Sequence, residues 1–298
     1  MKELEFSFLS VNGNSPGQKI VSTACIPENL SEKTGIMLFC HGWGNPRNQN
    51  FDKMKYSCDA FDLLCVAPEY RMSGYAFDPE KGAGWSQPYD LSFMQTFDCL
   101  NALRFLLDLY PFLDRKRIFV YGGSQGGHIA LLSSIFAPST FAFLYASCPL
   151  THIPEEGEAL DGYAGRDFSE AEKSVRNVPE HCSSIRCPVY LDAGTMDEAV
   201  SFSLHAEKLE KILKKENKQI TSIWYEGGRH DLSPVTNRLE AYKKMMPEVL
   251  KNARNTQKDD FLAGNIVKIK CADKILIIDW SKGTADKDLF HWEKAEEE

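Results

Sequence analysis

The chain has 298 residues, of which 43% are hydrophobic and 26% charged, and its net charge is −8 at pH 7. This composition is typical of a globular protein with a substantial core, and the acidic balance argues against a nucleic acid partner. No apolar run reaches the roughly 18 residues of a membrane helix, and the first residues lack the pattern of a signal peptide. Nine cysteines without a CxxC pair favour buried free thiols. We therefore expect a cytoplasmic protein that does not associate with a membrane.

Strand-like and helix-like segments alternate along most of the chain. The apolar run GIMLFC is typical of a strand buried on both faces, and the helical spacing of leucines after Asp90 is typical of an amphipathic helix. We expect strands at 4–11, 18–26, 35–40, 63–67, 117–121, 141–146, 188–192 and 221–225. We expect helices at 48–61, 90–110, 128–136, 169–181, 198–215 and 234–252. This alternation predicts an α/β fold: a mostly parallel sheet flanked by helices, with the first two strands as an antiparallel edge.

The C-terminal segment has a different pattern. Two β-type runs, 265–271 and 274–280, predict a β-hairpin. The second run is apolar on both faces, so we expect the hairpin to pack against another surface. On this basis we expect an α/β catalytic domain at 1–255 and a C-terminal extension at 256–298. The extension would add an edge strand or a subunit contact in a homo-oligomer.

Residues 122–127, GGSQGG, fit the pattern G-x-S-x-G, which places a nucleophilic serine on a sharp strand-to-helix turn. A strand is predicted before Ser124 and a helix after it, as this pattern requires. Gly122 and Gly126 leave room for the strand and the helix to approach closely. The start of the helix would also aim N–H groups and a positive dipole end at a developing oxyanion. The alternative is a glycine-rich turn that only caps a helix or cradles a phosphate.

A serine hydroxyl needs a base within hydrogen-bond reach, and in sheets of this kind the acid and the histidine follow the serine in chain order. Asp197 lies in a short loop after one predicted strand, and His230 lies in a glycine-bearing loop after the last strand. Asp192 is still inside a strand, and Asp231 is placed only to cap or to form a salt bridge. We therefore predict His230 as general base and Asp197 as its orienting acid. The alternatives are a helix N-cap for Asp197 and an ordinary surface-loop residue for His230.

The other histidines lack this placement. We expect His128 to pack in the first turn of its helix or to line a pocket wall. We expect His41 to hydrogen-bond its own loop rather than take part in chemistry. Four further histidines have no position after a strand end that suits a base: His152, His181, His205 and His291.

An oxyanion hole requires two N–H donors. One is expected from the residue after the nucleophile, Gln125, and the other from the loop after the third strand. That loop reads HGWGN, and Gly42 and Gly44 allow its backbone to approach a substrate. We therefore predict the N–H groups of Gln125 and Trp43 as the oxyanion donors.

A long loop follows the fourth predicted strand and contains several aromatic residues. Tyr75 and Trp85 are candidates for contacts with a sugar, an aryl ester or a short acyl chain. The alternative is that these aromatic residues only pack the loop onto the domain. Arg71 is expected in a structural ion pair rather than in an anion site.

Taken together, the segments HGWGN, APEYRMSG, GGSQGGH, DAGTMDEAV and YEGGRH resemble the α/β-hydrolase superfamily over residues 20–252. Within it, the chain is similar to the branch that holds prolyl-oligopeptidase-like domains and acetyl xylan (cephalosporin C) deacetylases. GGSQGG resembles the deacetylase form of the turn. The resemblance implies a catalytic triad of Ser124, Asp197 and His230, with the Trp43 and Gln125 amides as oxyanion donors.

The expected function is that of a serine carboxylic ester hydrolase, which forms an acyl-enzyme on small short-acyl esters such as O-acetyl sugars. No metal or organic cofactor is required for this chemistry. One alternative is a prolyl-oligopeptidase-like aminopeptidase or amidase that uses the same residues. Another is a thioesterase or acyltransferase, and a third is a non-catalytic binding or scaffold protein that keeps the fold.

Overall fold

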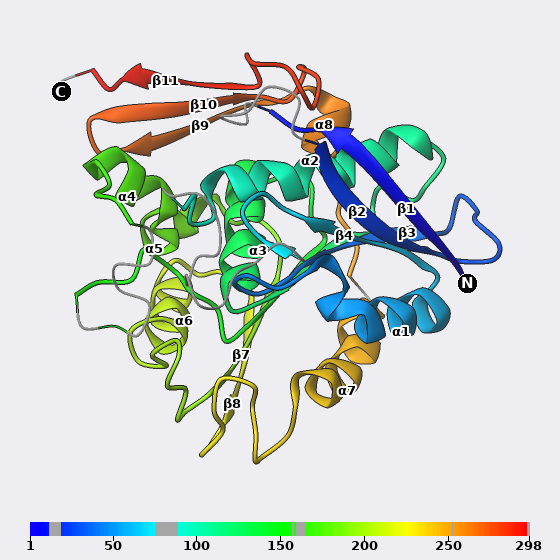
Figure 1. The fold of residues 1–298 in the computed structure, drawn as a ribbon, viewed down its shortest axis with the longest axis horizontal. Helices are drawn as coiled ribbons and strands as arrows, with labels where there is room; N and C mark the ends of the chain where they lie inside the picture. The colour runs from blue at the N-terminus through cyan, green and yellow to red at the C-terminus, as the bar shows by residue number, and fades with distance from the viewer. Residues whose placement is uncertain (12–18, 75–88, 157, 159–164, 252, 297–298) are drawn as a thin grey trace.

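The structure, a computed structural model, describes residues 1–11, 19–74, 89–156, 158, 165–251 and 253–296. Its strands form an eight-stranded sheet and a three-stranded sheet (Figure 1). Within the described residues, no helix has the length and apolar content needed to cross a membrane.

The large sheet has the strand order β1-β2-β4-β3-β5-β6-β7-β8. Its strands are β1 (Lys2–Leu9), β2 (Lys19–Ile26), β3 (Gly35–Cys40), β4 (Leu63–Glu69), β5 (Ile118–Gly123), β6 (Phe143–Ser147), β7 (Val189–Gly194) and β8 (Ile220–Tyr225). β1 and β2 pair antiparallel, β2 pairs antiparallel with β4, and all further neighbours are parallel. The expected α/β fold with an antiparallel N-terminal edge is confirmed.

Successive side chains of a strand point to opposite faces of the sheet, and both faces of β3 are covered. Ile36 and Leu38 belong to the core on one face, whereas Met37 and Phe39 belong to the core on the other. α1 (Phe51–Phe61) and α7 (Arg238–Leu250) cover the second face (Figure 1). The first face is covered by α2 (Phe93–Leu109), α3 (Gln125–Phe136) and α6 (Ala206–Lys215). The described residues also include five short helical segments: η1 (Arg47–Asn50), α4 (Glu170–Arg176), α5 (Val178–His181), η3 (Cys182–Ser184) and α8 (Asp260–Ala263).

The helices that follow β7 and β8 begin later than the sequence predicts. The helix expected at 198–215 begins only at Ala206, and the one expected at 234–252 begins at Arg238. The second start is set by Asn237, whose side chain accepts hydrogen bonds from the N–H groups of Leu239 and Glu240. As a result, the loops after β7 and β8 are longer than expected.

The C-terminal sheet consists of β9 (Ile266–Cys271), β10 (Lys274–Asp279) and β11 (Phe290–Lys294), in the order β11-β10-β9. The predicted hairpin is present as β9 and β10. The sequence reasoning missed β11, whose signal is the alternation of Phe290 and Trp292. The Phe290 ring stacks on Phe97 of α2 with centroids 4.6 Å apart.

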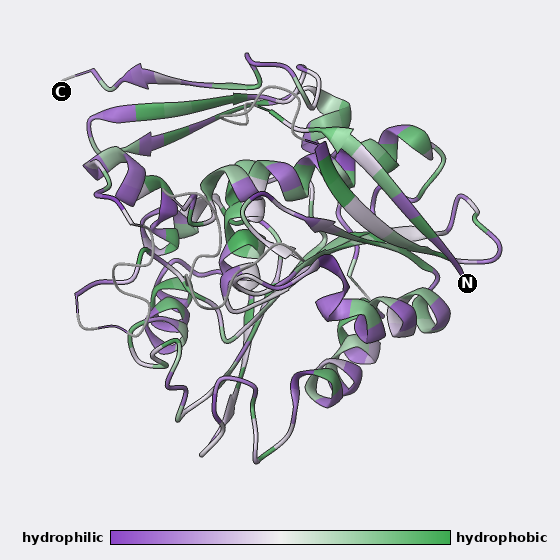
Figure 2. Cartoon of the chain, viewed as in Figure 1, coloured by the Kyte–Doolittle hydropathy of each residue, from purple (hydrophilic) through white to green (hydrophobic). Residues whose placement is uncertain are grey.

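The C-terminal sheet packs against α2 and α3. Trp280 has no exposed surface, and its Nε1–H donates a hydrogen bond to the carbonyl of Phe136 at 2.9 Å. Leu276 and Ile278 share one hydrophobic core with the large sheet. Figure 2 shows most of β10 and part of α3 in the hydrophobic colours. The expectation that this segment packs is confirmed, while a domain boundary at residue 255 stays a prediction.

All nine cysteines are free and buried, as the sequence predicts. Several lie inside strands, including Cys40 in β3 and Cys65 in β4. Burial raises the pKa of the Cys187 thiol to about 12. These thiols therefore act as small apolar side chains in the folded chain.

Candidate active site

Ser124 lies on a sharp turn between β5 and α3, as the motif predicts. Its φ is +59° and its ψ is −126°, a conformation that non-glycine residues rarely adopt. A Cβ atom on Gly122 would lie 1.9 Å from the carbonyl oxygen of Gly126, so only glycine permits this turn. The turn holds the Ser124 hydroxyl at the carboxyl end of the central strand.

The structure brings together three residues that are far apart in the sequence. Nε2 of His230 lies 3.0 Å from Oγ of Ser124, and Nδ1 of His230 lies 2.7 Å from Oδ2 of Asp197. The Asp197 side chain is 1% exposed and that of His230 is 24% exposed. A buried carboxylate that accepts the Nδ1 proton leaves Nε2 as the acceptor for the serine hydroxyl.

The two loops that carry Asp197 and His230 are bonded to each other. The N–H of Met196 donates to the carbonyl of Gly228 at 2.8 Å. A Cβ atom on Gly194 would lie 2.2 Å from this same carbonyl oxygen, so the loops meet at backbone contact distance. Arg238 at the start of α7 donates a hydrogen bond from Nη2 to the carbonyl of His230 at 2.6 Å. These contacts set the distance between the carboxylate and the imidazole.

The two carboxylates considered as rivals of Asp197 have other partners. Asp192 is buried in β7, where the Tyr145 hydroxyl donates to it, and burial raises its pKa to about 6. Asp231 accepts hydrogen bonds from the backbone and the hydroxyl of Ser233.

Asp197 makes two kinds of contact. One carboxylate oxygen accepts from the N–H groups of Ala199 and Val200 at 3.0 and 2.8 Å, and the other faces His230. Asp197 is therefore not a helix N-cap, because α6 begins only at Ala206. One oxygen of Asp197 caps the turn at Ala199 and Val200, and the other faces His230.

The two segments expected to form the oxyanion hole are in direct contact. A Cβ atom on Gly126 would lie 2.2 Å from the carbonyl oxygen of Cys40 and 2.4 Å from that of His41. The start of α3 therefore packs directly on the loop that contains Trp43. As the first residue of α3, Gln125 has an N–H group that no intrahelical carbonyl satisfies.

The side chain of Gln125 is fully buried and belongs to a polar network that the sequence reasoning missed. The Tyr89 hydroxyl donates to its Oε1 at 2.9 Å, and its Nε2 donates to Oε1 of Gln95 at 2.8 Å. The Tyr89 ring in turn stacks on Trp43 with centroids 4.7 Å apart. Gln125 therefore supports the Trp43 loop from inside the protein through Tyr89. Its buried side chain makes packing contacts rather than contacts with a substrate.

The two other histidines near the site are buried and neutral. His41 stacks on Tyr70 at 3.8 Å, and burial lowers the pKa of His41 to about 4. His128 donates from Nε2 to the carbonyl of Arg176 at 2.7 Å, and burial lowers its pKa to about 3. Nδ1 of His41 donates to the carbonyl of Gly42 at 2.9 Å, so His41 hydrogen-bonds its own loop as expected, and His128 packs in the first turn of α3 as expected.

Tyr75 and Trp85, the predicted substrate contacts, lie outside the described residues. Arg71 forms a buried ion pair with Asp98, with Nη2 of Arg71 2.7 Å from Oδ1 of Asp98. The expectation of a structural ion pair is confirmed.

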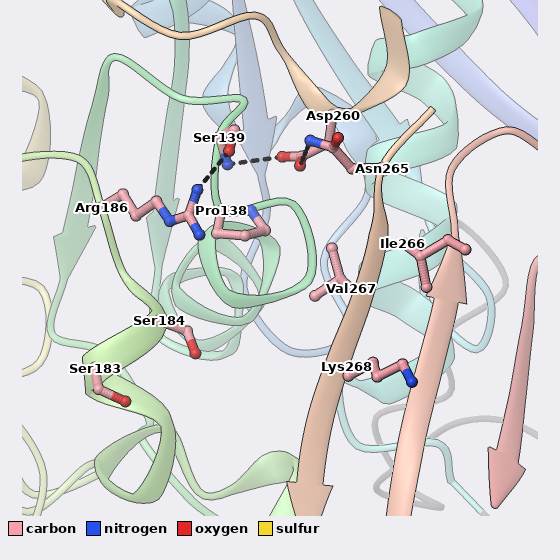
Figure 3. A pocket seen from close by; sticks show the side chains of 10 residues that line it. All are labelled: Pro138, Ser139, Ser183, Ser184, Arg186, Asp260, Asn265, Ile266, Val267 and Lys268. Carbon is pink, nitrogen blue, oxygen red and sulfur yellow. Dashed lines mark hydrogen bonds between the residues drawn. The ribbon is translucent and has the colours of Figure 1, made fainter. Parts of the chain in front are cut away.

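A polar cavity of about 490 Å³ lies at the amino ends of the parallel strands, opposite to the end that carries Ser124 (Figure 3). Its wall includes Ser139 and Arg186, which precede β6 and β7, whereas Ser124 and Asp197 follow β5 and β7. Arg186 donates to Oγ of Ser139 at 2.9 Å, and the N–H of Ser139 donates to Asp260 at 2.7 Å. These polar groups tie the C-terminal segment to the large sheet, far from the serine.

Comparison with known proteins supplies the family. The prolyl oligopeptidase family model matches residues 49–248, more than half of the chain. The uncharacterized peptidase YtmA of Bacillus subtilis (strain 168) is 27% identical over 150 residues, which are 47% of this chain and 58% of that protein.

Solved structures of acylaminoacyl peptidase show the same fold. The enzyme of Pyrococcus horikoshii superposes with a TM-score of 0.68 at 17% identity, over 86% of this chain and 42% of that one. An acylaminoacyl peptidase in complex with Z-Gly-Gly-Phe-chloromethyl ketone gives the same values. The chain thus spans less than two thirds of the length of each of these relatives. It has the α/β-hydrolase fold and belongs to the prolyl oligopeptidase family of serine hydrolases.

Proposed function

We propose that this member of the family is a peptidase that cleaves short peptides through an acyl-enzyme on Ser124. The observation that carries the proposal is the hydrogen-bonded chain from Ser124 through His230 to Asp197 at the carboxyl ends of β5, β8 and β7. The family match and the peptidase names of the relatives favour an amide over an ester as the natural substrate.

In the proposed reaction, Oγ of Ser124 attacks the carbonyl carbon while Nε2 of His230 takes the hydroxyl proton. Asp197 holds the proton on Nδ1 and stabilises the imidazolium that forms. The N–H groups of Gln125 and Trp43 donate to the oxyanion of the tetrahedral intermediate. His230 then gives its proton to the leaving amine, and a water hydrolyses the acyl-enzyme by the same path.

The short-acyl esterase expected from the sequence remains the second candidate. One argument for it was that GGSQGG resembles the deacetylase form of the turn. Because the Gln125 side chain is buried against Tyr89 and Gln95, that residue cannot choose between an ester and an amide. The peptidase proposal therefore has at least equal support.

A matched pair of substrates tests the proposal. Alanine p-nitroanilide and alanine p-nitrophenyl ester share an acyl group and differ in the bond that breaks. An amide is harder to hydrolyse than an ester, so the anilide should have the lower kcat/KM. For a peptidase we expect this value to stay within about a hundredfold of the ester value. Turnover of esters alone, together with release of acetate from acetylated xylose, would favour the esterase.

The control is Ser124→Ala, which should lose both activities. A fluorophosphonate probe should label the native chain at Ser124. If neither substrate reacts and the probe does not label, the hydrolase proposal fails and a binding role takes its place.

A further inference from the structure

A cysteine thiol lies beside His230, the proposed general base, and Asp197, the carboxylate that orients it. Cys148 follows β6 and is 1% exposed. Its Sγ, a carboxylate oxygen of Asp197 and a ring nitrogen of His230 all lie within 4.8 Å of one another. The mechanism leaves this thiol without a role.

This set of three side chains matches the ligands of a zinc ion. Zn²⁺ binds thiolate, imidazole and carboxylate in a tetrahedron, with bonds of about 2.0 to 2.3 Å. Ligand atoms around such an ion lie roughly 3.5 Å apart. Movements on the order of 1 Å would therefore convert the present arrangement into a three-ligand site, with water as the fourth ligand.

We propose that Cys148, Asp197 and His230 form an inhibitory Zn²⁺ site in which the metal switches off the histidine base. The inhibitory part of the proposal rests on the function proposed above. The metal-binding part depends only on the three side chains.

The inhibition follows from where the protons go. Because Oδ2 of Asp197 lies 2.7 Å from Nδ1 of His230, an ion shared by these residues takes the position of the Nδ1 proton. That proton moves to Nε2 and keeps the imidazole neutral, while the thiol of Cys148 releases its proton to water. Nε2–H then faces Oγ of Ser124 at 3.0 Å and can only donate, so it cannot activate the hydroxyl. One thiolate and one carboxylate neutralise the two charges of the ion.

The positive charge of Arg238 opposes metal binding, whereas the exposed part of His230 gives a route of access. The guanidinium of Arg238 interacts with Cys148 and repels a cation, but it also favours the thiolate that the metal needs. Burial works against the thiolate and raises the pKa of Cys148 to about 12, so the metal must displace a tightly held proton. His230 is 24% exposed, and an ion reaches the site along the same face as a substrate.

A second group of potential ligands, His152, Glu158 and His205, supplies a comparison within the same chain. The N–H of Thr151 donates to Nδ1 of His205 at 3.1 Å, so the proton of this ring is on Nε2, where it donates to Glu158 at 2.8 Å. An ion bound there would leave Ser124 and His230 untouched. It would stabilise the chain without changing the histidine base.

Two measurements test the proposal. Zn²⁺ should inhibit hydrolysis by the native chain, and EDTA should restore it; in Cys148→Ala the Zn²⁺ concentration for half-inhibition should rise at least tenfold. Co²⁺ should give the native chain a near-ultraviolet thiolate-to-metal absorption band, which Cys148→Ala should lose. Cys148→Ser, with nearly the original volume, repeats both measurements in case the alanine variant unfolds.

Cys182→Ser and His152→Asn are matched controls, since Cys182 is another buried thiol and His152 belongs to the second group. Both should keep the inhibition and the cobalt band. Equal zinc sensitivity with and without Cys148, or no cobalt band in the native chain, would overturn the proposed site. A chain without hydrolase activity that still shows the Cys148-dependent band would overturn the proposed function and keep the metal site.

Discussion

Among the residues that the structure describes, two hydrogen-bonded chains link a hydroxyl, a histidine and a carboxylate, and of these two only one has the features of an active site. In the first, Ser124 and Asp197 lie 3.0 and 2.7 Å from the ring of His230. In the second, the Thr151 hydroxyl lies 3.1 Å from Nδ1 of His205, and Nε2 of His205 lies 2.8 Å from Glu158. The hydrogen-bond distances alone do not distinguish them.

The solvent exposure of the histidine and the groups around the hydroxyl distinguish the two hydrogen-bonded chains. His230 is 24% exposed, whereas His205 is 1% exposed and burial lowers its pKa to about 4. Ser124 sits at the N-terminus of α3, which aims N–H groups at the reacting atom; the N–H of Thr151 is bonded to His205 instead. A hydrogen-bonded chain becomes a candidate for catalysis only where a carbonyl group can enter and oxyanion donors are in place.

The sharpest test exchanges the two hydroxyl groups for apolar atoms. Ser124→Ala should lower kcat by about 10⁴ to 10⁶, because the attacking oxygen is lost. Thr151→Val should lower it by less than about threefold and cost about 1 kcal/mol of unfolding free energy for its lost hydrogen bonds. Initial rates on p-nitrophenyl acetate measure the first effect, and urea unfolding measures the second.

A large loss of kcat in folded Thr151→Val would show that the hydrogen-bonded chain of Thr151, His205 and Glu158 takes part in the reaction. Near-native rates in Ser124→Ala would show that Ser124 is not the nucleophile, so that the two hydrogen-bonded chains would no longer differ in catalytic role.

The carboxylates provide the second test. Asp197→Asn keeps an oxygen for the N–H groups of Ala199 and Val200 but favours the wrong tautomer of His230, so kcat should fall by about 10⁴. Glu158→Gln should leave kcat within about threefold. Thermal unfolding in parallel should show that Asp197→Asn is folded; a variant that kept its rate would leave Asp197 only the role of capping the turn at Ala199 and Val200.

A third test removes one support of the proposed oxyanion segment. Tyr89→Phe deletes the hydroxyl that donates to Gln125 and accepts from Gln95, while its ring can still stack on Trp43. We expect kcat to fall by about tenfold, with KM changed less, because a misplaced N–H donor weakens mainly the transition state. An equal change in kcat and stability in Tyr242→Phe, a buried tyrosine whose hydroxyl bonds to Ser57 instead, would indicate general loosening.

The smallest effect concerns pH and the second histidine. The pKa of His205 is lowered to about 4, so the unfolded chain binds a proton first as the pH falls below 6.5. Stability is therefore lost between pH 6.5 and 4, by up to about 1.4 kcal/mol per pH unit for this residue. In His205→Gln the slope of unfolding free energy over this window should be smaller by about that amount. Between pH 7 and 8 the two slopes should be equal, and a difference there would contradict the assignment.

The positions of the site residues were predictable because the signals are local. A strand, two glycines and a helix around Ser124 indicate the turn, and strand ends followed by short loops indicate Asp197 and His230. Because the carboxyl ends of parallel strands lie at the same edge of the sheet, these residues are expected to lie close together. Their catalytic roles stay proposals that the tests above address.

Contacts between distant segments were not predictable in this way. The sequence around Gln125 resembles the deacetylase form of the turn, yet the Gln125 side chain bonds to Tyr89 and Gln95, which lie 36 and 30 residues earlier in the chain. β11 was missed because its five residues are polar except for two aromatic side chains that pack across the fold. Such pairings depend on the three-dimensional arrangement of segments that local periodicity does not report.

The burial of all nine thiols bears on how long the protein survives outside a reducing solution. In the folded chain no thiol is exposed enough to form a cross-link readily. Each unfolding event uncovers nine thiols at once, and oxidation to mismatched disulfides then competes with refolding. In air, the time for which the protein stays active is therefore set by its rate of unfolding. The rate at which an excess of a thiol reagent modifies the cysteines measures that unfolding rate.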